Sequence, residues 1–263
     1  MAKPVRGSTA VSLGAAVLVV GAPLVYGLLQ LPGILNPSNL GVFSTFINSP
    51  WQLVLPLLAV AVGCSRLYED LGDRHVANLR PRMSVEGYLL RTAARATLAP
   101  FIVFTCAIAV AGIVSFLVWP LIGNPFIDSS IYHLAPDSHG APDLAIFTYS
   151  ELMQFGWPVY LISYAAFFGL SCAAFSALGS ATLLLVERRS VALLIPWAVY
   201  IVETIIAALL DAAHAGLMYS VVPFGLQPIP ALPGALPVIF LSVIVGLVWV
   251  WVWRRRYELP KLR

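Results

Sequence analysis

The chain alternates between long apolar runs and shorter polar segments. Because the hydrocarbon core of a bilayer is about 30 Å thick, one helical crossing needs about 20 mostly apolar residues. Runs of about this length predict six transmembrane helices: Val11–Leu31, Phe46–Cys64, Leu98–Ile122, Trp157–Val186, Val191–Leu210 and Leu236–Trp253. The pattern therefore predicts an all-α, polytopic membrane protein that forms a single transmembrane domain over residues 1–263.

Three of these runs have individual features. The second is the least regular, because its cleanest part begins only at Pro50 and Pro56 interrupts it. The fourth is longer than the bilayer requires, so we expect that helix to tilt or to project beyond the bilayer. The first follows basic residues, as a signal peptide does, but no A-x-A cleavage site follows near its end at Leu31. We expect it to remain as a membrane helix.

The segment Leu217–Pro237 is apolar but contains five prolines. Proline lacks the backbone donor of a helix and clashes with the preceding turn, so this segment cannot be one continuous spanning helix. We expect an outer hairpin between the fifth and sixth helices, with a short helix near Asp211–Ser220, that is either re-entrant or lies on the surface. An apolar surface loop is an equally good interpretation.

Charge adds the orientation of the helices. With 60% hydrophobic and 10% charged residues, the chain is neither an ordinary soluble domain nor a disordered one. All 15 Lys and Arg residues fall at the N-terminus, after the second run, between the fourth and fifth runs, or at the C-terminus. The positive-inside rule then predicts that both termini are cytoplasmic. The net charge of +3 is too small to indicate a nucleic-acid partner.

The sequence offers little evidence of catalysis. It has two lysines, neither after a glycine-rich loop, so the phosphate-binding loop of ATPases is absent and we expect no enzyme activity in this chain. The three cysteines have no zinc or disulfide spacing, and His133, Asp137 and His139 match no known metal site. Gly169–Cys172 resembles part of an intramembrane protease motif, but close helix packing explains such small residues better. We therefore expect no catalytic, cofactor or metal site.

Glu203 is the ionisable residue that lies well inside a predicted span. A charged carboxylate at that depth costs at least about 2.5 kcal/mol, so Glu203 is expected to be neutral, paired or next to a wet cavity. On one helix Glu203, Asp211 and His214 would form a polar stripe toward the outer face. The stripe predicts either a translocation path or dimer seam, or a carboxyl group that a neighbouring helix satisfies. Both interpretations stay open.

The first cytoplasmic loop, Ser65–Ala96, is the long polar segment on the inner side. Within it Tyr68, Leu71 and His75 have helical spacing, Pro81 ends the pattern, and Ser84 is placed to cap a second helix. Such a short helix between two membrane helices is a suitable contact for a cytoplasmic partner. The alternatives are a solvated connector stabilised by its own ion pairs, or basic residues that set topology and touch anionic membrane lipid.

This order of elements resembles the permease subunit of the type-2 ATP-binding-cassette (ABC) exporters. The resemblance includes Tyr68-Glu69-Asp70-Leu71-Gly72, then Leu79-Arg80-Pro81, and Tyr88-Leu89-Leu90 entering the third span. It implies a homo- or heterodimer of permease chains in a plasma membrane, in a bacterium, with two separate ATPase subunits that bind ATP and Mg. In that family the first-loop helix docks on the ATPase, and spans two and five line the path.

Carried onto this chain, the resemblance implies an ATPase-coupling helix and a translocation path or dimer seam. The coupling residues are expected to be Glu69, Asp70, Leu71, Asp73, Arg74 and His75, and the path residues Glu203, Asp211 and His214. Two other functions stay open: an ion- or proton-coupled secondary transporter that uses Glu203, and a membrane immunity or scaffold protein without transport.

Overall fold

The computed structural model describes residues 6–72, 84–128, 147–212, 215–221 and 229–258. Across these ranges the chain is helical, and extended pairing is confined to an isolated bridge between Asn36 and Ile127. Helical segments long and apolar enough to cross a membrane confirm the six predicted spans: Ala10–Gly33, Pro50–Gly72, Val85–Leu121, Trp157–Leu185, Arg189–Leu209 and Ala231–Arg254. The protein is an all-α, multi-pass membrane protein.

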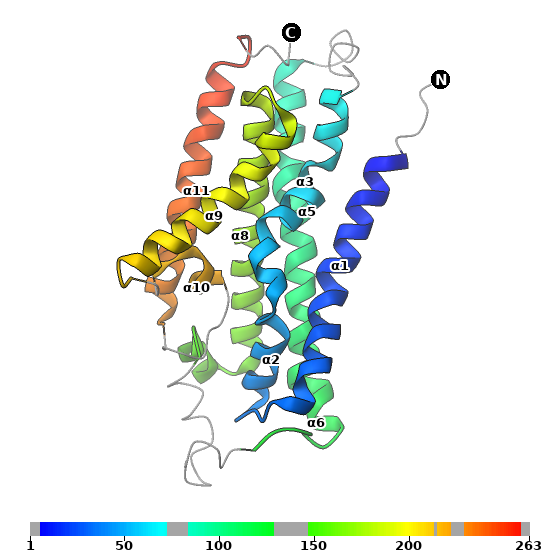
Figure 1. The fold of residues 1–263 in the computed structure, drawn as a ribbon, viewed down its shortest axis with the longest axis vertical. Helices are drawn as coiled ribbons and strands as arrows, with labels where there is room; N and C mark the ends of the chain where they lie inside the picture. Colours follow the sequence, from blue (N-terminus) through cyan, green and yellow to red (C-terminus); the bar gives the residue numbers. More distant parts are fainter. Residues whose placement is uncertain (1–5, 73–83, 129–146, 213–214, 222–228, 259–263) are drawn as a thin grey trace.

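The spans are built from the following elements, shown in Figure 1. The long helices are α1 (Arg6–Gln30), α3 (Leu55–Gly72), α5 (Val85–Ile113), α8 (Trp157–Leu185), α9 (Arg189–Leu209) and α11 (Ala231–Arg254). The shorter elements are η1 (Leu31–Gly33), α2 (Asn39–Ile47), η2 (Pro50–Val54), η3 (Val114–Val118), α6 (Trp119–Leu121), η5 (Ser150–Phe155) and α10 (Leu217–Val221).

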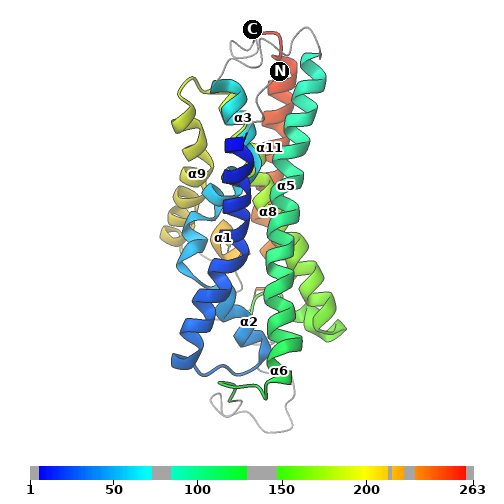
Figure 2. The same ribbon diagram turned by 90° about the vertical axis from the view of Figure 1, so that its right-hand side faces the viewer.

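Helix α8 lies at the centre of the bundle. It packs against α3, α5, α9 and α11, while α1 lies outside α3 and α5 (Figures 1 and 2). Small residues on α8 allow these close approaches, because backbones can come near each other only where side chains are small. Gly169 faces α5, where a Cβ would overlap Thr105, and Gly179 faces Val60 of α3. The sequence of α8 is apolar on all faces, as is typical of a buried helix, and most of α8 is buried.

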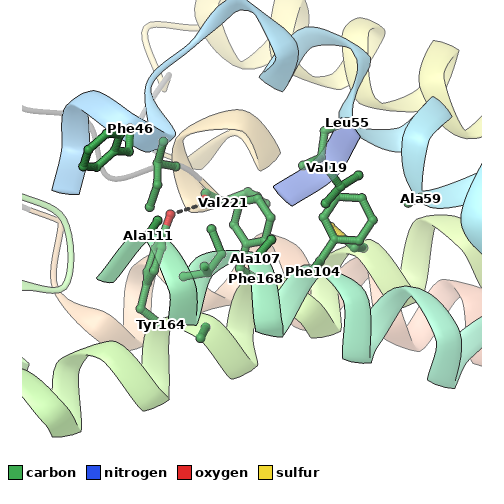
Figure 3. Close-up of a cluster of buried hydrophobic side chains, with 14 of the residues drawn as sticks. Val19, Phe46, Leu55, Ala59, Phe104, Ala107, Ala111, Tyr164, Phe168 and Val221 are labelled. Atoms are coloured by element: carbon green, nitrogen blue, oxygen red, sulfur yellow. Dashed lines mark hydrogen bonds between the residues drawn. The ribbon is translucent and has the colours of Figure 1, made fainter. Parts of the chain in front are cut away.

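Aromatic side chains fill the half of the core nearer η1 and α6. Phe104 of α5 and Phe168 of α8 have ring centroids 6.1 Å apart (Figure 3). Tyr160 and Tyr164 of α8 stack with their ring centroids 5.9 Å apart. Phe43 of α2 meets both tyrosines edge-on. These large rings fix the position of α2 against the bundle, since each aromatic pair adds to the free energy of burying the rings.

The predicted second span, Phe46–Cys64, is wrong at its start. Phe46 and Ile47 end the separate helix α2, and the second span begins at Pro50. The reason is local: Asn48 and Ser49 leave helical geometry, and proline at the start of η2 needs no backbone donor there. Both α2 and α3 are apolar, so hydropathy alone joined them into one run.

Two further boundaries differ from the predictions. The third span begins at Val85, 13 residues before Leu98, because Ser84 accepts a hydrogen bond from Gly87 N and Glu86 lies in the first turn, as expected for a capped helix. The sixth span begins at Ala231, ahead of Leu236. Pro233 lies in its first turn, where a proline is tolerated, and Pro237 follows inside the helix. The proline-rich segment is thus interrupted, as predicted, but its last part belongs to α11.

The basic segments adjoin helix termini that all lie at one end of the bundle. α1 begins there, α3 ends, α5 begins, α8 turns into α9, and α11 ends (Figures 1 and 2). We call this the basic end. The arrangement is the one that six crossings require, and the cytoplasmic location of the basic end stays a prediction from the distribution of Lys and Arg.

Candidate functional site

The short helix α10 sits between α9 and α11 and packs against both and against α8. Leu217, Ser220 and Val221 are buried. A helix of this length cannot satisfy its own backbone, because the first donors and last acceptors of any helix lack partners within it. In a membrane protein these groups must find partners elsewhere in the protein. The surrounding side chains supply them at both ends of α10.

Glu203 of α9 supplies an acceptor at the start of α10. Its carboxylate Oε2 accepts a hydrogen bond from the backbone N–H of Leu217 at 2.9 Å. The side chain is half-buried, and its carboxyl oxygen faces the helix end where unpaired backbone donors lie. The sequence allowed two interpretations of Glu203, and this contact matches the second, a carboxyl group that bonds to a neighbouring helix.

Two tyrosines supply donors at the other end of α10. The hydroxyl of Tyr149 donates to the carbonyl oxygen of Ser220 at 2.8 Å, and the hydroxyl of Tyr164 donates to that of Val221 at 2.6 Å (Figure 3). A tyrosine hydroxyl is protonated at neutral pH, and burial raises the pKa of the Tyr149 phenol further above its ordinary range, so this hydroxyl also remains a donor in alkaline solution.

The segment that carries Tyr149 also holds the start of α11. The backbone N–H of Tyr149 donates to the carbonyl oxygen of Ile229 at 2.9 Å, and Glu151 Oε1 accepts from Ala231 N at 2.6 Å. We call Tyr149, Glu151, Tyr164 and Glu203 the hairpin anchor. Tyr149, Tyr164 and Glu203 bond the two ends of α10, and Glu151 bonds the first residue of α11. The two helices are thereby held to α8, to α9 and to the segment that contains η5.

Replacing Tyr149 by phenylalanine is expected to destabilise the hairpin by about 1 kcal/mol, the usual contribution of one buried hydrogen bond. The ring would still fill its site, so the effect isolates the hydroxyl. Tyr26→Phe is the control, because Tyr26 is half-buried and shows no hydroxyl bond to the residues that the structure describes, whereas Tyr149 is buried and bonded. Hydrogen exchange of residues 217–221 would measure the change. Equal exchange in both variants would contradict the assigned role of Tyr149.

At the basic end, Arg189 joins the end of α3 to the start of α9. Its guanidinium Nη1 donates to the carbonyl oxygen of Tyr68 at 3.4 Å, and its Cζ lies 5.4 Å from the centroid of the Tyr68 ring. A cation there also complements the partial negative charge of the α3 carboxyl end. Gly72 leaves room for this guanidinium, since a Cβ at Gly72 would overlap Arg189 Nη1.

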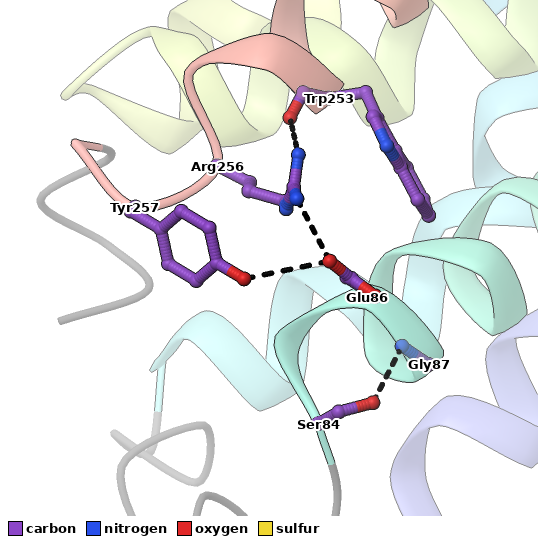
Figure 4. A network of polar contacts seen from close by, with 6 residues as sticks. All are labelled: Ser84, Glu86, Gly87, Trp253, Arg256 and Tyr257. Carbon is purple, nitrogen blue, oxygen red and sulfur yellow. Dashed lines mark hydrogen bonds and ion pairs between the residues drawn. The ribbon is translucent and has the colours of Figure 1, made fainter.

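A second contact ties the start of α5 to the end of α11 (Figure 4). Arg256 Nη2 donates to Glu86 Oε1 at 2.8 Å, and the Tyr257 hydroxyl donates to the same oxygen at 3.4 Å. Arg256 also donates to the carbonyl oxygen of Trp253 at 3.0 Å. Both described ends of the first basic-end loop, at Gly72 and Ser84, are therefore positioned by residues from later helices.

The residues predicted for ATPase coupling divide into two groups. Glu69, Asp70 and Leu71 lie in the last turns of α3, so this part of the expected helix continues the second span. Asp73, Arg74 and His75 lie outside the described residues. The structure thus places the first half of the predicted contact surface directly on a membrane helix, and does not test the contact itself.

The predicted stripe of Glu203, Asp211 and His214 does not continue along one helix. α9 ends at Leu209, and Asp211 has a left-handed backbone with φ of 55°. His214 lies outside the described residues, as do His133, Asp137 and His139. Glu203 faces α10, whereas Asp211 is exposed beyond the helix end.

Sequence reasoning missed most of the hairpin anchor. Tyr149, Glu151 and Tyr164 were not singled out, because each bonds to a backbone group, and a backbone partner leaves no residue pattern to search for. The acidic residue Glu151 just before an apolar run was the available signal. Arg189 was counted only toward topology, although its place at the first turn of α9 fits a contact with the end of another helix.

Comparisons with protein families, with curated proteins and with solved structures find no match to this chain. Its chemistry must therefore be inferred from its own contacts. Within the part of the chain that the structure describes, no group of three or more His, Cys, Asp or Glu side chains converges. Ser171, in the protease-like segment, is buried and donates to Phe167 O at 2.9 Å. The candidate site therefore consists of hydrogen bonds that join one helix to another.

Proposed function

We propose that this chain is the transmembrane subunit of an ATP-driven exporter in a bacterial plasma membrane. It forms the translocation path with a second permease chain, identical or related, and separate ATPase subunits bind the ATP and Mg. The six spans, the hairpin between the fifth and sixth spans, and a first basic-end loop with positioned ends support this assignment.

The observation that carries the proposal is the double tie between the second and fifth spans. Near the basic end, Arg189 of α9 donates to Tyr68 O of α3. Farther along, the indole Nε1 of Trp197 donates to the carbonyl oxygen of Leu53, in η2 just before α3, at 2.9 Å. The resemblance to type-2 exporters assigns the path to these same two spans.

These ties give a mechanical route from an ATPase to the path. An ATPase that binds the loop after Gly72 would displace the end of α3. The contact of Arg189 with Tyr68 would transmit this displacement to α9. Because Glu203 lies on α9 and bonds to α10, the hairpin would shift with it. ATP-driven movement would thereby tilt spans two and five and open the path at the other end.

A charge reversal tests the partner. Asp70→Arg, alone or with Asp73→Arg, is expected to weaken association with a P-loop ATPase about tenfold or more, because like charges across an interface cost several kcal/mol. Asp128→Arg is the matched control, since Asp128 is exposed near the end opposite the basic end. The chain would be purified from its native host, and co-purified ATPase quantified by mass spectrometry.

Two results would contradict this proposal. One is a wild-type preparation in which no P-loop ATPase co-purifies, together with unchanged behaviour of the Asp70 variant. The other is transport that survives ATP depletion and collapses with the ion gradient, which would favour the secondary transporter that uses Glu203. A membrane scaffold or immunity role predicts neither ATPase association nor transport.

A further inference from the structure

A cavity of about 550 Å³ opens between α1, α3 and α5 toward the basic end. Its size is that of pockets that hold small ligands. The lining comes from the three helices and combines apolar with polar side chains: Ser12, Leu13, Ala16, Val62, Gly63, Ser65, Arg66, Arg95, Ala99 and Val103. None of these residues belongs to the hairpin anchor or to the ties between α3 and α9.

The polar and apolar parts of this lining lie at different depths. On α3 the apolar run ends at Cys64, and Arg66 follows half a turn later; on α5 the apolar run starts at Ala96, directly after Arg95. Val62 and Val103 lie on the side of these arginines away from the basic end. The arginines therefore mark the level where the hydrocarbon region gives way to lipid headgroups.

Both arginines are available to a ligand. Arg66 and Arg95 are exposed, and neither forms an ion pair within the part of the chain that the structure describes. Guanidinium groups bind phosphate through paired, charge-assisted hydrogen bonds. The hydroxyls of Ser12 and Ser65 meet at 2.6 Å beside them and bridge α1 to α3 at the cavity.

The helices pack closely at Gly63, which also lines the cavity. A Cβ at Gly63 would overlap Ser176 Oγ of α8 and lie 2.9 Å from Ala96 O of α5. α3 and α5 are thus already in close contact at Gly63.

We propose that this cavity binds an anionic phospholipid from the leaflet at the basic end. Arg66 and Arg95 hold the phosphate group, and an acyl chain lies along Leu13, Val62 and Val103. The apolar walls distinguish a lipid from free phosphate, and two cationic groups favour an anionic over a zwitterionic headgroup. The site is independent of any ATPase and does not rest on the proposed function.

Native mass spectrometry of the full-length protein in detergent, with added phosphatidylglycerol, tests the site. The double variant Arg66→Gln/Arg95→Gln is expected to bind this lipid about tenfold more weakly or worse, since each arginine near a membrane surface contributes about a factor of five. Arg91→Gln is the matched control. Arg91 is also exposed on α5, one turn before Arg95, but does not line the cavity.

A second variant separates binding from folding. Ala16→Phe keeps both arginines and fills the cavity from α1, so it is also expected to lose the bound lipid, while gel filtration shows an intact fold. Retention of phosphatidylglycerol by the double arginine variant, or equal loss in Arg91→Gln, would overturn the proposal. So would equal binding of phosphatidylcholine, or displacement of the lipid by inorganic phosphate at millimolar concentration.

Discussion

Replacing Glu203 by leucine is expected to lower the free energy of unfolding by about 1–3 kcal/mol, the penalty for leaving a buried donor unpaired. The lost partner is the Leu217 N–H at the start of α10, which would face an apolar side chain with no water to replace the carboxylate. Glu203→Gln keeps a carbonyl acceptor at the same reach, so it is expected to retain most of the stability.

The protein's own cysteines provide the measurement. Cys64 and Cys172 are buried, whereas Cys106 is exposed. In a Cys106→Ser background, a thiol-reactive dye would therefore report unfolding of the core. A shift of about 2–4 °C in Tm for each kcal/mol is expected for a chain of this size. A glutamine variant as unstable as the leucine variant would show that the charge itself is needed, which the hydrogen-bond role does not predict.

Adding a single methyl group at Gly169 is expected to destabilise the bundle by about 1–3 kcal/mol through overpacking. In Gly169→Ala the Cβ would overlap Thr105 Oγ1 and lie 2.8 Å from Phe101 O of α5. The carbonyl is part of a helix backbone and cannot turn away, so α5 and α8 would have to separate. The same dye measurement would report the change.

Gly246→Ala on α11 is the control for Gly169→Ala. A Cβ at Gly246 would meet nothing within 4 Å, so only the helix propensity changes. Alanine is favoured over glycine in a helix by about 1 kcal/mol, and this variant is therefore expected to keep or raise Tm. If Gly169→Ala were as stable as Gly246→Ala, the α5–α8 contact would not depend on the missing side chain.

Hydropathy predicted the fold well because each crossing must hide its backbone from lipid, and only long apolar helices do so. It failed where two apolar helices adjoin. α2 and α3 are separate helices because of the break at Asn48 and Ser49, and a window that averages hydropathy does not register such a break. The helix that Ser84 was predicted to cap is confirmed as the first part of α5, while the hydropathy boundary at Leu98 marked only where the apolar part of that helix begins.

The candidate site was predictable in part. Glu203 stood out because ionisable groups are costly inside a span, and that argument left open both a path or dimer seam and a carboxyl group with a partner on a neighbouring helix. The hydrogen bond from Leu217 N is a contact of the second kind. The identity of the partner was not predictable, because the backbone of Leu217 is chemically like any other. The same holds for Arg189, whose carbonyl partner at Tyr68 depends on how α3 and α9 pack.

The hairpin anchor also constrains the order of membrane insertion. Among the described residues, three side chains that hydrogen-bond the backbone of α10 come from segments synthesised earlier: Tyr149, Tyr164 and Glu203. A nascent chain that has reached Val221 therefore already contains all of these partners for α10. α11, the last helix, then packs against segments that were synthesised before it. One of them carries Glu151, whose carboxylate accepts the hydrogen bond from Ala231 N in the first turn of α11.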